Sequence, residues 1–253
     1  MIKYLLIFYA GTFAGSFFYT LALRYAGGMF DSSPVAALIS RSECPRCGSP
    51  VSVIGLIPVF GYFFLRGRCS ACGEKISPVY PLWEVLYGAL AVAVSVYHGT
   101  GLLSLNVFFL CAVCVCIAIV DIRIMIIPQS LVLLFLLLSL YPVVLNHNIL
   151  DNVYGFFLLT LFFLLMLLIF PGAFGGGDVK LYAAAGFLFG VEMSIVLLEV
   201  SLISGALFGV AYAMARGRNF RLKIPFGPFI AAGIIITLLF GDTILLVYYR
   251  FMF

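Results

Sequence analysis

Long uninterrupted apolar runs dominate this chain and restrict its fold more than any other feature. Two of them, residues 131–145 and 156–170, contain no charged side chain. Runs of this kind lack the polar and apolar alternation of an outer-membrane strand and are typical of helices that cross a bilayer. Only 9% of the 253 residues are charged, against about 25% in soluble domains. The sequence therefore predicts an all-α polytopic membrane protein, and it excludes a soluble enzyme and a nucleic-acid-binding protein.

The number of spans follows from the length of each run, because crossing the hydrocarbon takes about 20 helical residues. We expect about eight transmembrane helices, at residues 2–23, 82–97, 102–120, 127–145, 153–171, 179–191, 194–215 and 229–249. The sixth contains Gly186 and Gly190, small residues that allow close helix packing. Three parts result: a first helix (1–23), a polar insert (24–81) and a seven-helix membrane domain (82–253).

The basic residues predict the orientation of these spans. All Lys and Arg residues except Lys3 and Arg250 fall within four segments, 24–81, 121–127, 172–180 and 216–223. Eight spans place all four segments on one side of the membrane. Basic loops are retained on the cytoplasmic side. We therefore expect a multi-pass protein of the bacterial inner membrane with a cytoplasmic insert and with both termini outside.

Four of the seven cysteines form two CxxCG sequences in the insert: Cys44, Cys47, Cys69 and Cys72. Two such knuckles favour a closed tetrahedral four-cysteine site with a structural Zn²⁺. Cytoplasmic thiols stay reduced, which argues against two disulfides. Iron or unligated thiols are the alternatives. The apolar stretch between the pairs, including 57–64, is expected to pack on the knuckles or to lie against the membrane surface. Cys111, Cys114 and Cys116 are interpreted as packing residues.

Two aspartates stand at the cytoplasmic ends of apolar segments. Asp121 follows the third predicted span, and Asp178 follows the glycine run 175–177. Ionisable residues at this depth are costly, and glycines let a partner helix or a substrate approach. Two adjacent carboxylates share a proton, so that one acts as acid while the other activates water. This pattern favours aspartic-protease chemistry. The alternatives are that Asp178 caps the following helix and that Asp121 pairs with Arg123 or Lys180.

The other acidic residues are weaker candidates. Glu84, beside Trp83 at the start of the second span, is interpreted as an interfacial residue. Glu199 lies within the seventh predicted span and is expected to have a polar partner there.

Several stretches together resemble the type IV prepilin peptidases, a family of bacterial membrane proteases. Residues 40–48 and 66–73 resemble that family's cytoplasmic tetracysteine domain. Asp121 with Pro128 seven residues later resembles its first catalytic motif. The sequence from Gly175 through Gly177 and Asp178 to Lys180 resembles its second, the GxGD motif, and residues 225–233 resemble the segment before its last span. The resemblance covers nearly the whole chain.

This resemblance implies an intramembrane aspartic endopeptidase with Asp121 and Asp178 as its catalytic pair. The implied substrate is a prepilin or pseudopilin, cut after a short basic leader at the cytoplasmic face, with its apolar helix lying among the spans in the lipid bilayer. In many members of the family, methylation of the new N-terminus by S-adenosylmethionine follows, and we assign no residue to that cofactor. Two departures are Tyr19, near which the family often has asparagine, and Gln129, where aspartate or asparagine is frequent.

Two other functions stay open from the sequence. One is a related GxGD peptidase with another substrate, against which the tetracysteine insert argues. The other is a non-catalytic membrane transporter, against which the position of the aspartates at the membrane face and the lack of a clear internal repeat argue. Cleavage of a prepilin distinguishes these functions.

Overall fold

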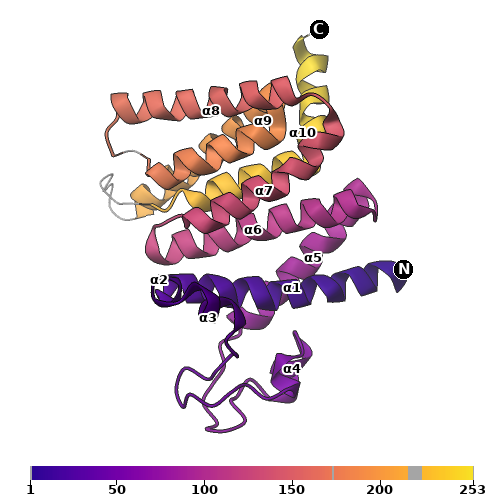
Figure 1. The fold of residues 1–253 in the computed structure, drawn as a ribbon, viewed down its shortest axis with the longest axis vertical. Coiled ribbons are helices and arrows are strands. Elements are labelled where there is room, and N and C mark those ends of the chain that lie inside the picture. The colour runs from indigo at the N-terminus through magenta and orange to yellow at the C-terminus, as the bar shows by residue number, and fades with distance from the viewer. Residues whose placement is uncertain (1, 173, 216–223, 253) are drawn as a thin grey trace. The chain divides into compact units, whose positions relative to one another are not determined.

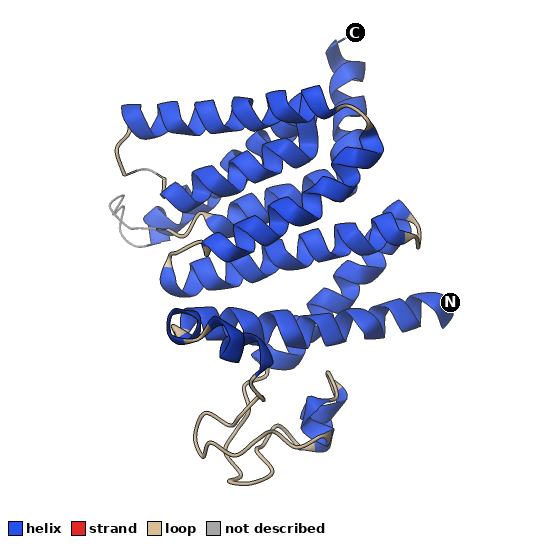
Figure 2. Ribbon diagram, viewed as in Figure 1, coloured by secondary structure: helices blue, strands red, loops and turns tan. Residues whose placement is uncertain are grey.

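The computed structural model describes residues 2–172, 174–215 and 224–252, and the described residues are helical apart from connecting loops and two isolated bridges (Figures 1 and 2). Four basic residues used for the predicted orientation, Arg216, Arg218, Arg221 and Lys223, lie outside this part of the chain. The predicted all-helical class is confirmed.

Among the described residues, seven helices are long and apolar enough to cross a membrane. They are α1 (Ile2–Ala26), α5 (Val79–His98), α6 (Leu102–Ile124), α7 (Gln129–Asn146), α8 (Ile149–Ile169), α9 (Gly176–Ala215) and α10 (Gly227–Met252). The insert contains four short elements, α2 (Met29–Ser32), α3 (Pro34–Ile39), η1 (Ile54–Leu56) and α4 (Phe60–Phe64).

The 40-residue helix α9 explains how eight predicted spans become seven helices. Gly190 within it has φ 69° and ψ −168°, a conformation open to glycine but not to other residues. The hydroxyl oxygens of Tyr182 and Ser201 lie 2.6 Å apart. In a straight helix their positions would be separated by about 28 Å. The chain therefore turns back at Gly190, and the arms 176–189 and 191–215 correspond to the sixth and seventh predicted spans.

Side chains of α8 satisfy the backbone groups that this turn sets free. The Asn152 side-chain amide donates to the carbonyl oxygens of Phe187 and Leu188, at 2.8 and 3.2 Å. The Asp151 carboxylate accepts from the Val191 N–H at 3.3 Å. Buried backbone groups need partners of this kind wherever a helix breaks.

Glycines also bring α8 close to the first arm of α9. A Cβ built on Gly186 would collide with the carbonyl oxygen of Gly155, and the reverse holds as well. The predicted role of Gly186 in close packing is therefore confirmed.

The chain forms two compact units, residues 1–104 and 105–253. In the first unit α1 packs against α5, with Gly11 and Gly15 of α1 facing the backbone of α5. In the second unit α9 packs against α7, α8 and α10. The boundaries predicted from sequence, after residues 23 and 81, stay predictions.

Candidate active site and metal centre

Asp121 lies in the last turn of α6 and is only 5% exposed. Its Oδ2 accepts a hydrogen bond from the N–H of Gly227, the first residue of α10, with an N···O distance of 2.7 Å. A Cβ on Gly227 would lie 2.7 Å from that oxygen and 3.0 Å from the Asp121 Cβ. Glycine therefore permits this approach, and the N-terminus of α10 offers a favourable place for a carboxylate.

Asp178 lies in the first turn of α9 and is 8% exposed. Its Oδ2 accepts from the Gly175 N–H at 2.8 Å, while the Asp178 N–H donates to the Gly175 carbonyl at 3.0 Å. This is the carboxylate half of a capping box, with Gly175 as the N-cap. The alternative that Asp178 is itself the N-cap is therefore wrong, because Asp178 occupies the third helical position.

Aromatic packing joins the segments that hold the two aspartates. Phe226, the residue before Gly227, packs edge-on against Phe174 with ring centroids 5.2 Å apart. Phe226 also lies 6.5 Å from the ring of Tyr182, one turn after Asp178. The start of α10, which holds the Asp121 carboxylate, therefore lies beside the start of α9, which carries Asp178. The structure thus brings together two carboxylates that are far apart in the sequence.

Two further contacts connect the two aspartate-bearing motifs. The Lys180 ammonium donates to the Gln129 side-chain oxygen, Nζ···Oε1 2.7 Å, which ties the start of α9 to the start of α7 beside Pro128. A Cβ on Gly177 would lie 2.9 Å from the Ile127 Cβ, so the glycine run also lies against the α6–α7 connection. Sequence reasoning considered Lys180 as a partner of Asp121 and did not anticipate its bond to Gln129.

Gly227 is the residue at this site that sequence reasoning missed. The resemblance covered residues 225–233 without giving them a role. The available signal was a glycine between Phe226 and Pro228 at the start of the last span. Its importance comes from its closeness to Asp121, which no local pattern reveals.

The four cysteines of the insert converge on one point in the first unit. Their sulfur atoms all lie within 4.8 Å of one another, and Cys44 Sγ is 3.9 Å from Cys72 Sγ. Four Zn–S bonds of about 2.3 Å place the sulfurs about 3.8 Å apart in a tetrahedron. The N–H groups of Gly48 and Gly73 donate to the first cysteine carbonyl of each pair, both at 2.9 Å. The four sulfurs therefore fit a metal ion.

Hydrogen bonds favour the thiolate form of two of these cysteines. The Ser49 side chain and backbone lower the pKa of Cys47 to about 6. The backbone N–H groups of Cys72 and Ala71 lower the pKa of Cys69. Against a hydrogen bond at the Glu74 backbone, burial and the neighbouring cysteine side chains raise the pKa of Cys72 to about 12. Thiolates are the form that binds metal, so the four thiols are not all in that form until an ion binds.

Two acidic residues outside the site have partners that the sequence did not identify. Glu84 is 8% exposed, and its Oε2 accepts from the Val59 N–H at 2.6 Å. The interpretation of Glu84 as an interfacial residue did not include this partner and stays a prediction. Glu199 has the polar partner expected for it, because the Tyr248 hydroxyl donates to its carboxylate. Cys111, Cys114 and Cys116 are all buried, as expected of packing residues.

Comparison with known proteins gives consistent matches along the chain. Residues 9–98 match the bacterial peptidase A24 N-terminal domain, and residues 108–210 match the type IV leader peptidase family. The prepilin leader peptidase/N-methyltransferase of Bacillus subtilis (strain 168) is 32% identical over 249 residues, 97% of either chain. The protein of the same name from Aeromonas hydrophila is 34% identical over 222 residues, 85% of this chain and 76% of its own. No solved structure matches significantly.

Proposed function

The chain belongs to the type IV leader peptidase family, and from this premise we propose that Asp121 and Asp178 are the catalytic pair with which it cuts prepilins or pseudopilins. One arrangement of side chains supports this assignment. The packing of Phe226 on Phe174 and Tyr182 brings together the segments that hold two buried carboxylates, and a glycine N–H holds one oxygen of each. The family activity is that of an aspartic-type prepilin leader peptidase and N-methyltransferase.

The roles of the two aspartates follow from their closeness. Two adjacent buried carboxylates do not both ionise readily, so the pair holds one proton between them. The ionised member takes a proton from a water molecule that attacks the scissile carbonyl. The protonated member donates to the carbonyl oxygen, and the departing amine receives a proton as the bond breaks. The pair titrates as a unit, so we assign neither role to one residue. The N–H groups of Gly175 and Gly227 fix the orientation of both carboxylates.

The surroundings of the pair suit a peptide that emerges from the membrane. A Cβ on Gly176 would have no atom within 4 Å, which leaves room for an extended substrate backbone two residues before Asp178. We propose that the substrate's basic leader lies on the cytoplasmic side and that its apolar helix lies among the spans. On this proposal both aspartates and the insert face the cytoplasm, and both termini lie outside the bacterial inner membrane.

We also propose that Cys44, Cys47, Cys69 and Cys72 hold Zn²⁺. In a site of four cysteine ligands the ion cross-links the two knuckles and has no open coordination position. Its contribution is therefore structural. For the second half of the activity, the resemblance implies S-adenosylmethionine as the methyl donor for the new N-terminal amine.

Cleavage of a prepilin by the detergent-purified protein tests the catalytic pair, with the loss of the leader read as a gel shift. We expect Asp121→Asn and Asp178→Asn each to reduce cleavage by at least about 100-fold, because each removes one partner in proton transfer. Asp242→Asn, at an exposed position in α10, is the matched control and should cleave at the wild-type rate. Mass measurement of the product N-terminus then detects methylation.

Each contrary result has a definite meaning. If both folded Asn variants cleave like wild type, the two aspartates only cap and pack. If the wild type leaves several prepilins intact but cuts another membrane peptide, it is a related peptidase with a different substrate. If it cuts nothing and both Asn variants abolish an ion flux, the protein is a transporter instead.

A further inference from the structure

The segment between the two cysteine pairs lies along the membrane helices of its own unit. The N–H of Val59, the residue before α4, donates to Glu84 in α5. The ring of Phe60 lies 6.0 Å from the ring of Tyr9 in α1, centroid to centroid. Figure 1 shows α4 level with the middle part of α1 and set apart from its ribbon, so the contact is made by side chains. These two contacts show how far the segment between the cysteine pairs extends along α1 and α5.

The position of Tyr9 sets the depth of Phe60. Ala26 ends α1 on the side that continues into the insert. The ring of Tyr80, at the start of α5, lies beside the ring of Tyr19 in α1, with centroids 5.0 Å apart. Tyr9 lies ten residues before Tyr19, about 15 Å along the helix. The hydrocarbon core is only about 30 Å thick. If α1 spans the bilayer, a side chain that touches Tyr9 lies well below the cytoplasmic surface, although the insert was predicted to be cytoplasmic.

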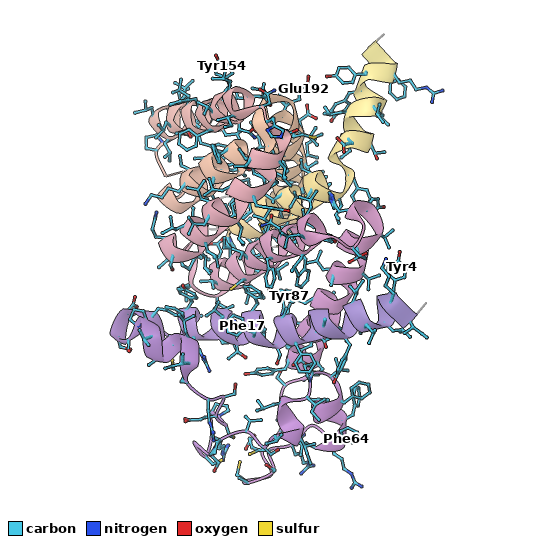
Figure 3. The ribbon with its side chains drawn as sticks, turned by 45° about the vertical axis from the view of Figure 1, so that its right-hand side comes forward. Tyr4, Phe17, Phe64, Tyr87, Tyr154 and Glu192 are labelled. Carbon is cyan, nitrogen blue, oxygen red and sulfur yellow. The ribbon has the colours of Figure 1, made fainter. Side chains whose placement is uncertain are left out.

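The aromatic side chains of α4 continue an exposed apolar surface of α1. Phe60, Phe63 and Phe64 are 52%, 66% and 68% exposed. Phe60 contacts Phe64, with centroids 6.5 Å apart, and Tyr9 contacts Phe13 on α1, at 5.1 Å. Figure 3 labels Phe64 on this short helix. Three exposed phenylalanines on five residues are unfavourable in water but not among acyl chains.

Backbone N–H groups of this segment have hydrogen-bond partners within the protein, as a position inside the bilayer requires. Val59 has φ 64°, outside the helical region, so its N–H cannot join a helical ladder. The buried Glu84 carboxylate accepts this N–H instead. The Gly61 N–H donates to the Ile57 carbonyl at 2.8 Å, and the Gly67 N–H donates to the Tyr62 carbonyl at 2.8 Å. Irregular backbone is tolerated within a bilayer only when protein groups supply such partners.

Arg66 and Arg68 follow directly after the apolar segment, and Lys75, beyond the second cysteine pair, lies opposite Arg68 in an isolated bridge. Arg66, Arg68 and Lys75 are exposed and line one cavity of about 410 Å³. Long basic side chains at the edge of a membrane segment extend toward the phosphates of anionic lipids. The order of aromatic and then basic residues matches the order of acyl chains and headgroups in the cytoplasmic leaflet.

We propose that residues 54–64 form a re-entrant segment. In this arrangement η1 and α4 insert among the acyl chains of the cytoplasmic leaflet beside α1, and Arg66, Arg68 and Lys75 contact the headgroups. The two cysteine knuckles on either side remain in water. The metal centre is thereby fixed to the membrane by the loop between its own ligand pairs.

Tryptophan fluorescence tests this arrangement, because Trp83 is the chain's only tryptophan. The Trp83 ring stacks on the ring of Tyr19, with centroids 6.0 Å apart. A Trp83→Phe background therefore keeps an aromatic ring at this position. Phe64→Trp and Phe63→Trp then place one probe each on α4, and Ser70→Trp places the matched control in the second knuckle. Each variant is reconstituted in vesicles of phosphatidylcholine and phosphatidylglycerol, with or without bromine on the acyl chains. Bound zinc, measured per chain, verifies folding.

Acyl-chain bromine should remove roughly half or more of the emission from positions 63 and 64 and little from position 70, because bromine quenches only at close range within the hydrocarbon. Aqueous iodide should give the reverse order. If iodide quenches positions 63 and 64 as strongly as position 70, the segment lies in water and the proposal is wrong. Phe63→Trp answers the same question should Phe64→Trp fail to bind zinc. Equal acyl-chain quenching at all three positions also contradicts the proposal.

Discussion

At the scale of single residues, Gly227 controls the geometry of the aspartate pair. In Gly227→Ala the new Cβ would lie 2.7 Å from Asp121 Oδ2 and must displace that carboxylate. A displacement of about 1 Å in a catalytic group costs on the order of 100-fold in rate. We therefore expect prepilin cleavage to fall by roughly that factor in kcat, with little change in KM.

The matched control is Gly209→Ala in α9, where the nearest atom to a new Cβ is 3.9 Å away. It should cleave like wild type. If Gly227→Ala does so too, Asp121 is not held as described.

Glu84 has a structural role that can be separated from catalysis. In Glu84→Leu the Val59 N–H loses its acceptor. An unsatisfied donor costs about 1–3 kcal/mol when fully buried, and the Val59 N–H is partly buried, so the lower end of this range applies. The free energy of unfolding in detergent should fall by about this amount. Glu84→Gln retains a side-chain oxygen and should lose less. Equal stability of the two variants would mean that the hydrogen bond contributes little.

The aspartates and cysteines were predictable one residue at a time because each stands in a local pattern: a charge at the end of an apolar run, or a pair of thiols before a glycine. Gly227 and Glu84 have no such pattern. Their roles depend on which segment lies opposite them, and that is decided by tertiary packing.

At the scale of elements, the turn within α9 depends on Gly190. Its φ of 69° and ψ of −168° are open to glycine alone, and a Cβ there would collide with Asp151. Strain of this kind costs about 1–3 kcal/mol before the collision is counted. We expect Gly190→Ala to lower the free energy of unfolding by at least that amount, measured by denaturant titration in detergent. Gly209→Ala, later in the same helix, serves for comparison. Similar stability of the two would show that the chain does not turn at Gly190.

Hydropathy was sufficient to locate the spanning helices, because each must be long and apolar. Most observed helices begin or end within a few residues of the predicted spans. The carbonyl-capping role of Asn152 and the aromatic packing of α4 on α1 were not predictable in this way. Both depend on contacts between elements that are far apart in the sequence.

At the scale of the whole molecule, the two chemical centres belong to different compact units. The cysteine cluster lies in residues 1–104, and the aspartate pair lies in residues 105–253. The boundary falls between the two stretches that match family sequences. Within the first unit, α5 packs against α1.

This separation predicts a local response to metal removal. In a small metal site, the free energy of metal binding contributes directly to folding. Removing the ion with a chelator, or changing Cys47 to Ser, should therefore loosen the knuckles and leave the second unit folded. We expect trypsin to cut the metal-free protein within residues 41–75 at least tenfold faster than the loaded protein. The C-terminal product should begin at residue 76 when cleavage follows Lys75, and its further digestion should proceed at the same rate with and without metal, because all four cysteine ligands lie before this residue. Re-addition of Zn²⁺ should restore resistance to the chelated wild type but not to Cys47→Ser. Equal digestion with and without metal would show that the insert does not depend on the ion.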